Sequence, residues 1–263
     1  MLDKPRSSAA NGIMSQPLHD PTLDSSEVAR FAALAEEWWD PQGKFAPLHA
    51  MNPARLTFIR DAICAHATRD PKASRSLTGL TIADIGCGGG LLCEPLARLG
   101  ASVTGVDPAE ETIAAARLHA ASQGLEIDYR AARAEALVDS GERFDVVLAI
   151  EVVEHVPDVA SFVTLVSKLL HPGGLLILST LNRTLKSYLL AIVGAEYILR
   201  WLPPGTHQWE RFVTPAELSR ALAACGLEEL ERKGVIFDPL QGQWRLASDT
   251  DVNYFMTARR APA

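Results

Sequence analysis

The stretch ADIGCGGG, residues 83–90, decides the fold, because it ends an apolar segment and opens a helical pattern. Glycine occupies four of its last five positions, at Gly86, Gly88, Gly89 and Gly90. Glycine allows a tight turn and a close approach of the backbone to a ligand, and the helix start that follows favours an anionic group. The stretch therefore predicts a strand, a ligand-binding loop and a helix in succession.

Two familiar phosphate-binding loops fit this stretch poorly. The dinucleotide pattern G-x-G-x-x-G counted from Gly86 requires glycine where the chain has Leu91, and the Gly-Lys-Ser/Thr of a P-loop does not follow. A nicotinamide-dependent dehydrogenase stays an alternative from a different class, because Asp107 would suit a nicotinamide ribose. Leu91 is the residue that tells against it.

Outward from this loop, short apolar segments alternate with helical patterns. The predicted strands carry the sequences LTIADIG, SVTGVD, EIDYRAA, FDVVLAIE, LLILSTL, LEELERKGVI and VNYFMTARR. Continuous apolar strands separated by helices are typical of a parallel sheet that is covered on both faces. Residues 80–263 are thus predicted to form a doubly wound α/β core with a mostly parallel seven-stranded sheet.

The residues before this core are expected to form two parts. Residues 1–24 are rich in Ser, Pro and Asp and are expected to be a flexible leader, and residues 25–79 are expected to be an N-terminal helical cap. One predicted helix follows Asp24, with Glu27 three residues on as in a capping box. Another is predicted with Asn52 as N-cap and Pro53 at its first position.

Composition narrows the class of partner and the location. The formal net charge is −7 and no block of like charge occurs, so a nucleic-acid partner is not expected. The four cysteines form no CxxC pair, which favours free thiols in a reducing cytosol. No run reaches the ~18 apolar residues that a spanning helix needs. Small-molecule chemistry in the cytoplasm is the expectation.

Two acidic residues extend the glycine pattern into a known motif. Asp84 precedes the glycines, and Asp107 ends the next strand in the string GVDP. Together they resemble motif I of class I S-adenosylmethionine-dependent methyltransferases, whose Rossmann-like fold is then expected. The resemblance implies Gly86 against the methionine part of the cofactor, Asp107 on its ribose and Ile150 as a wall. A helix N-cap is the other interpretation of Asp107.

Longer strings resemble a particular family within that class, the ubiquinone-biosynthesis O-methyltransferases. They are FAALAEEWWDPQGKFAPLHAMNPARLTFI, STLNRT, SYLLAIVGAEYILRWLPPGTH and DVNYFMTA, in this order over about residues 27–258. The resemblance implies methylation of a catechol-type hydroxyl at two steps, on a polyprenyl benzenediol and on demethylubiquinol, with other proteins of the pathway as partners. It also implies that Arg55 reaches the carboxylate of S-adenosylmethionine. A module that binds S-adenosylmethionine or lipid without catalysis is a further alternative.

An apolar stretch within the core is predicted to meet the lipid that a polyprenyl substrate requires. Residues 185–202, inside an insertion at about 183–212, gather Lys186, Glu196 and Arg200 on a narrow arc and leave a broad apolar surface. With Tyr188, Tyr197 and Trp201 this surface suits peripheral association with the inner membrane. A core helix or a subunit-interface helix is the alternative.

The string AIEVVEHVPD, residues 149–158, places ionisable groups at the end of a buried strand. If a helix starts here, Glu151, Glu154 and His155 share one face. They would then hold Mg²⁺ with the catechol oxygens, as the resemblance implies for eukaryotic relatives. Alternatively His155 acts as general base, with Glu151 as the second catalytic candidate. A third interpretation is that all three brace the turn under the cofactor.

Overall fold

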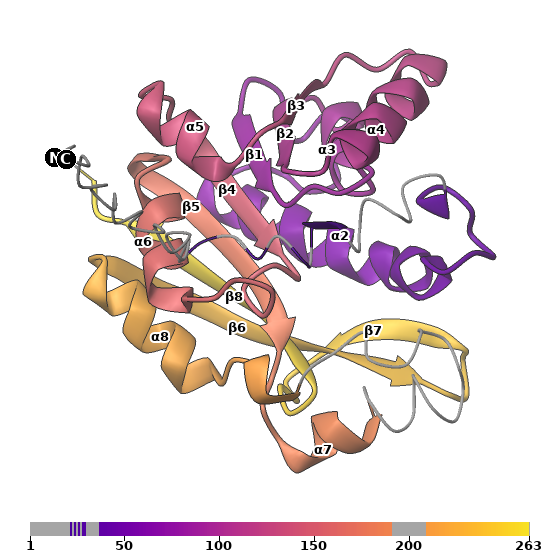
Figure 1. The fold of residues 1–263 in the computed structure, drawn as a ribbon, viewed down its shortest axis with the longest axis vertical. Helices are drawn as coiled ribbons and strands as arrows, with labels where there is room; N and C mark the ends of the chain where they lie inside the picture. Colours follow the sequence, from indigo (N-terminus) through magenta and orange to yellow (C-terminus); the bar gives the residue numbers. More distant parts are fainter. Residues whose placement is uncertain are drawn as a thin grey trace, which may run out of the picture.

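The computed structural model describes residues 22, 24, 26, 28, 29, 37–190 and 209–262, and these form one eight-stranded sheet covered by helices (Figure 1). The strands are β1 (Thr81–Ile85), β2 (Ser102–Asp107), β3 (Asp128–Ala131), β4 (Phe144–Ile150), β5 (Leu170–Leu181), β6 (Leu227–Asp238), β7 (Gln243–Ala247) and β8 (Asn253–Arg260). The helices are α2 (Ala46–His66), α3 (Cys93–Arg98), α4 (Glu110–Ser122), α5 (Ala134–Asp139), α6 (Val159–Ser167), α7 (Leu185–Ser187) and α8 (Pro215–Ala224).

The order of the strands explains where a ligand binds. The sheet runs β3-β2-β1-β4-β5-β8-β6-β7, with β1 to β5 parallel and β8 antiparallel to both β5 and β6. The chain moves outward from β1 to β2 and β3 and then returns to place β4 on the other side of β1. Ligands of open α/β sheets bind where the strand order reverses in this way, at the carboxyl ends of the strands.

The mostly parallel sheet is confirmed, but the count of seven strands was wrong by one. The additional strand is β7, which forms an antiparallel hairpin with β6 at the edge of the sheet. Its sequence QWRLA is only partly buried, so it lacks the continuous apolar run that marks the inner strands. Its pairing with β6 therefore became visible only in the tertiary structure.

Helices cover both faces of the sheet, as the apolar strands predict. Along β4, Val146 and Leu148 pack with α2, α3 and α4, whereas Val147 and Ala149 pack with α5, α6 and α8. Figure 1 shows these two helical layers on opposite sides of the strands. Because alternate side chains of a strand point to opposite faces, a strand buried on both sides must be apolar at nearly every position.

The N-terminal part differs from its prediction in one respect. Helix α2 begins at Ala46, with a proline in its first turn, so Pro53 lies inside the helix and Asn52 is not its N-cap. The Asn52 amide instead donates a hydrogen bond of 2.9 Å to the carbonyl of Leu91. Pro47 takes the first-turn place that was assigned to Pro53, because a proline there loses no helical hydrogen bond. Of the helix predicted after Asp24, residues 26, 28 and 29 are helical, residues 38 and 39 lie in a turn, and most of the rest lies outside the described residues, as does nearly all of the leader.

Candidate active site

The glycine loop after β1 lies against the turn after β4. The Gly86 amide donates to the Val106 carbonyl at 2.8 Å, which ties the loop to β2. A Cβ atom on Gly86 would stand only 2.7 Å from Val152 Cγ2, so no larger residue fits there without movement. Ile150, the last residue of β4, is buried beside this contact. The structure thus brings Gly86 and Ile150 together at the point where the strand order reverses.

Asp107 joins the glycine loop to the start of α4. Its carboxylate accepts hydrogen bonds from the Gly88 amide at 3.1 Å and from the Ala109 amide at 2.9 Å. Burial raises the pKa of this carboxyl, and the two amide hydrogen bonds oppose that rise. The N-cap residue of α4 is Ala109, so Asp107 braces the turn before the helix instead of capping it directly. Its role toward a ribose stays a prediction.

Asp84, on strand β1 just before the glycine loop, is a buried acid. Burial raises its pKa to about 7, a hydrogen bond from the Cys93 thiol lowers it, and the charge of Asp107 raises it further. The thiol lies 3.2 Å from the carboxylate, while the pKa of Cys93 itself is raised well above its ordinary value. Asp84 therefore holds its proton more tightly than an exposed aspartate does.

Arg55 carries hydrogen-bond donors that the described residues leave unused. Its side chain projects from α2, is buried, and lies 3.5 Å (Nη2 to Oε1) from Glu151 in an ion pair. Its Nε and Nη2 atoms are buried without a hydrogen-bond partner among the described residues. A buried guanidinium normally satisfies its fork of donors, so a carboxylate ligand fits this place.

Residues 151–158 of this string form a turn after β4, so the condition that a helix starts at Glu151 is not met. Helix α6 begins at Val159, where Asp158 accepts hydrogen bonds from the amides of Ala160 and Ser161. Aspartate at the N-cap satisfies the free amides of a first turn, and this sets the start of the helix. The three ionisable groups therefore do not share a helical face.

Two hydroxyls of β5 hold the two carboxylates of this turn. Ser179 Oγ donates to Glu151 at 2.8 Å, and Thr180 Oγ1 donates to Glu154 at 2.8 Å. Glu154 is buried, and its pKa is raised by that burial and by the nearby charge of Glu151. A carboxyl in this environment favours its protonated form.

The hydrogen bonds of Glu151 and Glu154 favour bracing, and the magnesium site stays a prediction. In residues 37–190 and 209–262 no three His, Cys, Asp or Glu side chains group closely enough to hold a metal ion. Mg²⁺ demands near-octahedral oxygen ligands that are free to bind it. Glu151 and Glu154 are instead paired with Arg55, Ser179 and Thr180, an arrangement that favours the bracing interpretation.

The chain matches a family model described as "Methyltransferase domain" over residues 83–178, which include the glycine loop, Asp107 and the turn after β4. It is 58% identical over 240 residues to a protein of Azorhizobium caulinodans named ubiquinone biosynthesis O-methyltransferase, covering 91% of this chain and 95% of that one. The protein with the same name from Rhizobium leguminosarum bv. trifolii is 57% identical over 240 residues, again covering 91% and 95%. The chain belongs to this O-methyltransferase family.

Solved structures show the same fold in more distant enzymes. Magnesium protoporphyrin IX methyltransferase from Synechocystis PCC 6803 with bound SAH has a TM-score of 0.59 at 19% identity, covering 89% of this chain and 94% of that one. A possible histamine N-methyltransferase from Thermotoga maritima also has a TM-score of 0.59 at 19% identity, with coverages of 88% and 97%. The expected Rossmann-like methyltransferase fold is thereby confirmed.

As an O-methyltransferase of this family, the enzyme uses S-adenosylmethionine as methyl donor, and the dehydrogenase alternative is overturned. The buried Arg55 donors that lack partners among the described residues are compatible with a ligand that carries a carboxylate, as this donor does. Sequence reasoning missed Ser179 and Thr180, although the string LST at the end of an apolar strand marks them. No helix of the described parts is long and apolar enough to cross a bilayer.

Proposed function

We propose that the enzyme transfers the methyl group of S-adenosylmethionine to a catechol-type hydroxyl of polyprenylated intermediates, at both O-methylation steps of ubiquinone biosynthesis. The observation that carries this proposal is the pairing of Arg55 with the turn after β4 and of Asp107 with the glycine loop, in a chain 58% identical to a ubiquinone biosynthesis O-methyltransferase. A catechol, with its two adjacent hydroxyls, also suits a site in which Glu151, Glu154 and His155 lie in one turn.

In this proposal the methyl donor lies over the carboxyl ends of β1 and β4. Arg55 binds its carboxylate, Gly86 lies against its methionine part, Asp107 accepts from its ribose hydroxyls, and Ile150 forms a wall. The donor supplies a methyl group on a positively charged sulfur. Transfer then depends on holding the acceptor oxygen in line with the departing sulfur and on excluding water.

We further propose that His155 takes the proton of the attacking hydroxyl, while Glu151 and Glu154 hold the turn that carries it. The hydroxyl contacts of both glutamates support this division of roles, since each carboxylate already has a donor on β5. In this division, Glu151 and Glu154 orient His155 and do not touch the substrate.

The lipid-facing part of the proposal concerns residues 183–212. Exposed apolar side chains gather where α7 follows β5: Leu185 is 72% exposed, Leu189 50% and Leu190 54%. This observation supports peripheral association with a membrane, because an apolar surface with an adjacent tyrosine suits the interface of a bilayer. Residues 191–208, which complete the predicted surface, lie outside the described residues. A surface of this kind also suits contact with other proteins of ubiquinone biosynthesis.

The proposal is tested by turnover with two acceptors. Purified enzyme with S-adenosylmethionine is expected to methylate a short-chain catechol and, faster, the polyprenyl benzenediol in detergent. Calorimetry should show binding of S-adenosylhomocysteine and none of NADH. Binding of S-adenosylhomocysteine without turnover of either acceptor would instead support a non-catalytic sensor.

A further inference from the structure

We propose that Trp39 is a positioning residue that couples the placement of residues 37–52, here called the tryptophan segment, to cofactor binding by the glycine loop. The partly exposed His119, paired with the buried Glu94, holds Trp39 in place. The inference rests on the proposed function, since it takes the glycine loop to bind S-adenosylmethionine. Trp39, His119 and Glu94 are not among the residues assigned above to the donor or the acceptor.

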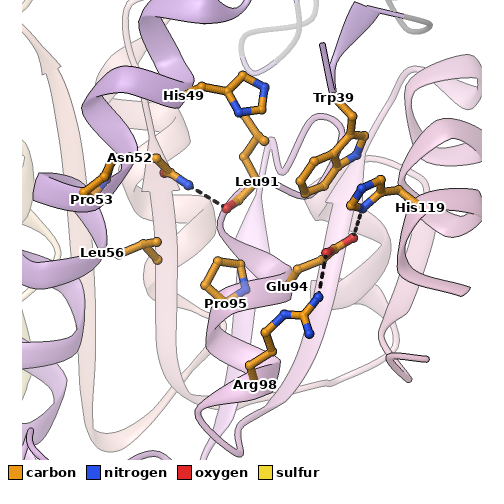
Figure 2. Close-up of a pocket in the computed structure, with 10 residues that line it drawn as sticks. All are labelled: Trp39, His49, Asn52, Pro53, Leu56, Leu91, Glu94, Pro95, Arg98 and His119. Atoms are coloured by element: carbon orange, nitrogen blue, oxygen red, sulfur yellow. Dashed lines mark hydrogen bonds and ion pairs between the residues drawn. The ribbon is translucent and has the colours of Figure 1, made fainter. Parts of the chain in front are cut away.

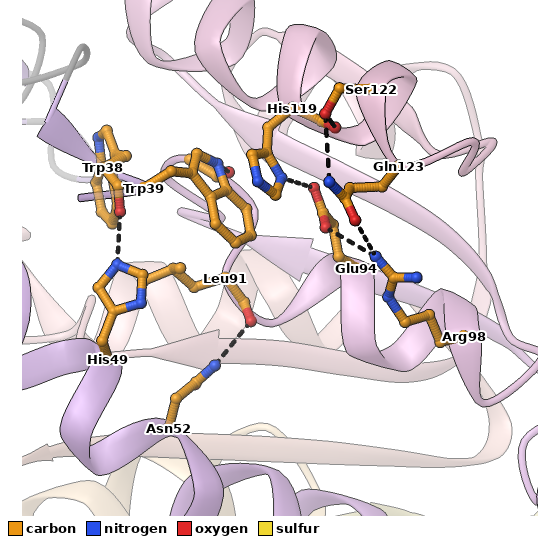
Figure 3. Close-up of polar contacts among 11 residues, drawn as sticks. Trp38, Trp39, His49, Asn52, Leu91, Glu94, Arg98, His119, Ser122 and Gln123 are labelled. Atoms are coloured by element: carbon orange, nitrogen blue, oxygen red, sulfur yellow. Dashed lines mark hydrogen bonds and ion pairs between the residues drawn. The ribbon is translucent and has the colours of Figure 1, made fainter. Parts of the chain in front are cut away.

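Trp39 contacts the glycine loop through its indole N–H. This group donates a hydrogen bond of 3.0 Å to the carbonyl of Gly89. The ring stacks on His119, with ring centroids 3.5 Å apart and ring planes at 6° to each other. Figure 3 shows the Trp39 indole with His119 on one side and Trp38 and His49 on the other. The direction of the N–H therefore depends on the plane that His119 sets.

His119 is itself fixed by an acid. Its Nδ1 atom lies 2.6 Å from Glu94 Oε1, and the Glu94 side chain is only 3% exposed. Arg98 completes the group at 3.7 Å from the other carboxylate oxygen. Since an ionised carboxylate only accepts hydrogen bonds, Nδ1 is the donor and the orientation of the imidazole follows.

These side chains line a cavity of about 350 Å³ between α2, α3 and α4 (Figure 2). Trp39 borders this space, so packing does not enclose the indole on every side. Stacking on His119 and the bond to Gly89 are then the contacts that hold its orientation. Loss of either contact leaves room for the ring to turn away from the loop.

The rest of the tryptophan segment closes on the same loop. Trp38 packs so closely that a Cβ atom on Gly88 would stand 2.4 Å from its ring, and one on Gly89 would stand 2.6 Å away. The Trp38 carbonyl lies 2.9 Å from His49 Nε2, and Asn52 binds the carbonyl of Leu91. Two of the four loop glycines thus leave room for a tryptophan, where the sequence had suggested room for a ligand.

The loop is consequently held from two sides. Asp107 binds the amide of Gly88, while Trp39 binds the carbonyl of Gly89. Because a peptide group is planar, holding these atoms fixes the 87–88 and 89–90 peptide planes, which flank the 88–89 peptide of the loop. A loop that is already ordered loses less conformational entropy when it binds the cofactor. By thermodynamic reciprocity, the bound cofactor must then stabilise the tryptophan segment to the same extent.

The test compares two tryptophans that make the same kind of bond. Trp39→Phe removes the indole N–H and keeps a ring for stacking on His119. Trp209→Phe is the matched control, because the Trp209 N–H also donates to a backbone carbonyl, that of Thr184 at 3.0 Å. In calorimetry with S-adenosylhomocysteine, we expect Kd to rise roughly fivefold to tenfold in Trp39→Phe. In Trp209→Phe it should stay within about twofold of wild type.

A second set of variants separates positioning from a merely structural role. Glu94→Gln keeps an oxygen that accepts from His119 and should retain wild-type affinity, whereas Glu94→Leu should lose as much affinity as Trp39→Phe. At saturating S-adenosylmethionine, kcat should be unchanged in Trp39→Phe while KM for the donor rises. A structural defect would instead lower kcat in proportion to the folded fraction. If Trp39→Phe does not fold, His119→Leu, which leaves the indole intact, is measured in its place.

Hydrogen exchange gives the reciprocal readout. S-adenosylhomocysteine should slow amide exchange of residues 38–52 in wild type and much less in Trp39→Phe. Unchanged affinity in Trp39→Phe, or equal protection of this segment in both proteins, would overturn the inference while leaving the methyltransferase function intact. Failure of the wild-type protein to bind S-adenosylhomocysteine would instead overturn the proposed function, and the inference with it.

Discussion

Arg55 and Glu151 form an ion pair of 3.5 Å between the N-terminal helix α2 and the turn after β4. The guanidinium is buried, and a single carboxylate at this distance leaves its Nε and Nη2 atoms without hydrogen bonds among the described residues. A buried arginine with unused donors is costly unless a ligand completes its partners. The pair therefore joins helix α2 to the turn after β4.

Substitution of Arg55 should weaken binding of the donor with little effect on the acceptor. In Arg55→Ala we expect a loss of about 2 kcal/mol in S-adenosylhomocysteine affinity, roughly thirtyfold in Kd, because a charge-assisted hydrogen bond is removed. Calorimetry measures this loss. Arg60→Ala, on the same helix and paired with the adjacent Asp61, is the matched control. Equal affinities in the two variants would exclude Arg55 from the donor site.

Removal of divalent metal should leave turnover intact, because the carboxylates of Glu151 and Glu154 are already held by hydroxyls of β5. The measurement is initial rate with a short-chain catechol after EDTA treatment and after return of Mg²⁺. A loss of rate that Mg²⁺ restores would revive the metal interpretation of this turn.

His155→Gln separates the two interpretations that do not need a metal. If His155 is the general base, kcat should fall by roughly 100-fold or more while the affinity for S-adenosylhomocysteine is unchanged. Raising the pH should partly restore the rate, since hydroxide then replaces the missing base. Full turnover in the variant would leave bracing as the role of the whole turn.

The buried acid Asp84 should make stability depend on pH. Burial raises its pKa from 3.8 to about 7, so between these values the folded protein binds a proton that the unfolded chain has lost. Stability from this group is then complete below about pH 4 and is lost as the pH rises toward 7, by on the order of 4 kcal/mol at most. Urea unfolding between pH 4.5 and 7.5 should show a shallower decline in Asp84→Asn. An unchanged slope would mean that Asp84 titrates as an ordinary aspartate.

Charges placed on the surface near α7 should release the enzyme from lipid. Leu185→Asp combined with Leu189→Asp is expected to abolish flotation with anionic phospholipid liposomes, because an ionised side chain resists transfer into the interface. Leu118→Asp is the matched control, since Leu118 is equally exposed, at 74%, on the distant helix α4. Equal flotation of both variants would mean that Leu185 and Leu189 do not contact lipid.

The sequence alone predicted the core because its signals are local. The glycine loop, the apolar strands and the acid in GVDP each occupy one short segment, so their residue types suffice to indicate strand, loop and ligand class. Arg55, Gly86, Asp107 and Ile150 could be named together only through the family resemblance. Strand β7 was not predicted because a half-exposed edge strand has no continuous apolar run.

The tertiary structure decided what no local pattern contains. The sequence left open whether a helix starts at Glu151; in the structure Asp158 caps α6, and hydroxyls of β5 bind Glu151 and Glu154. Those partners are distant in sequence and become neighbours only when β4 pairs with β5. The same holds for Trp39, which reaches Gly89 from a segment that precedes the sheet. The sequence thus determined the fold and the class of methyl donor. Packing between segments that are distant in sequence decided the hydrogen-bond partners of Glu151, Glu154 and Trp39.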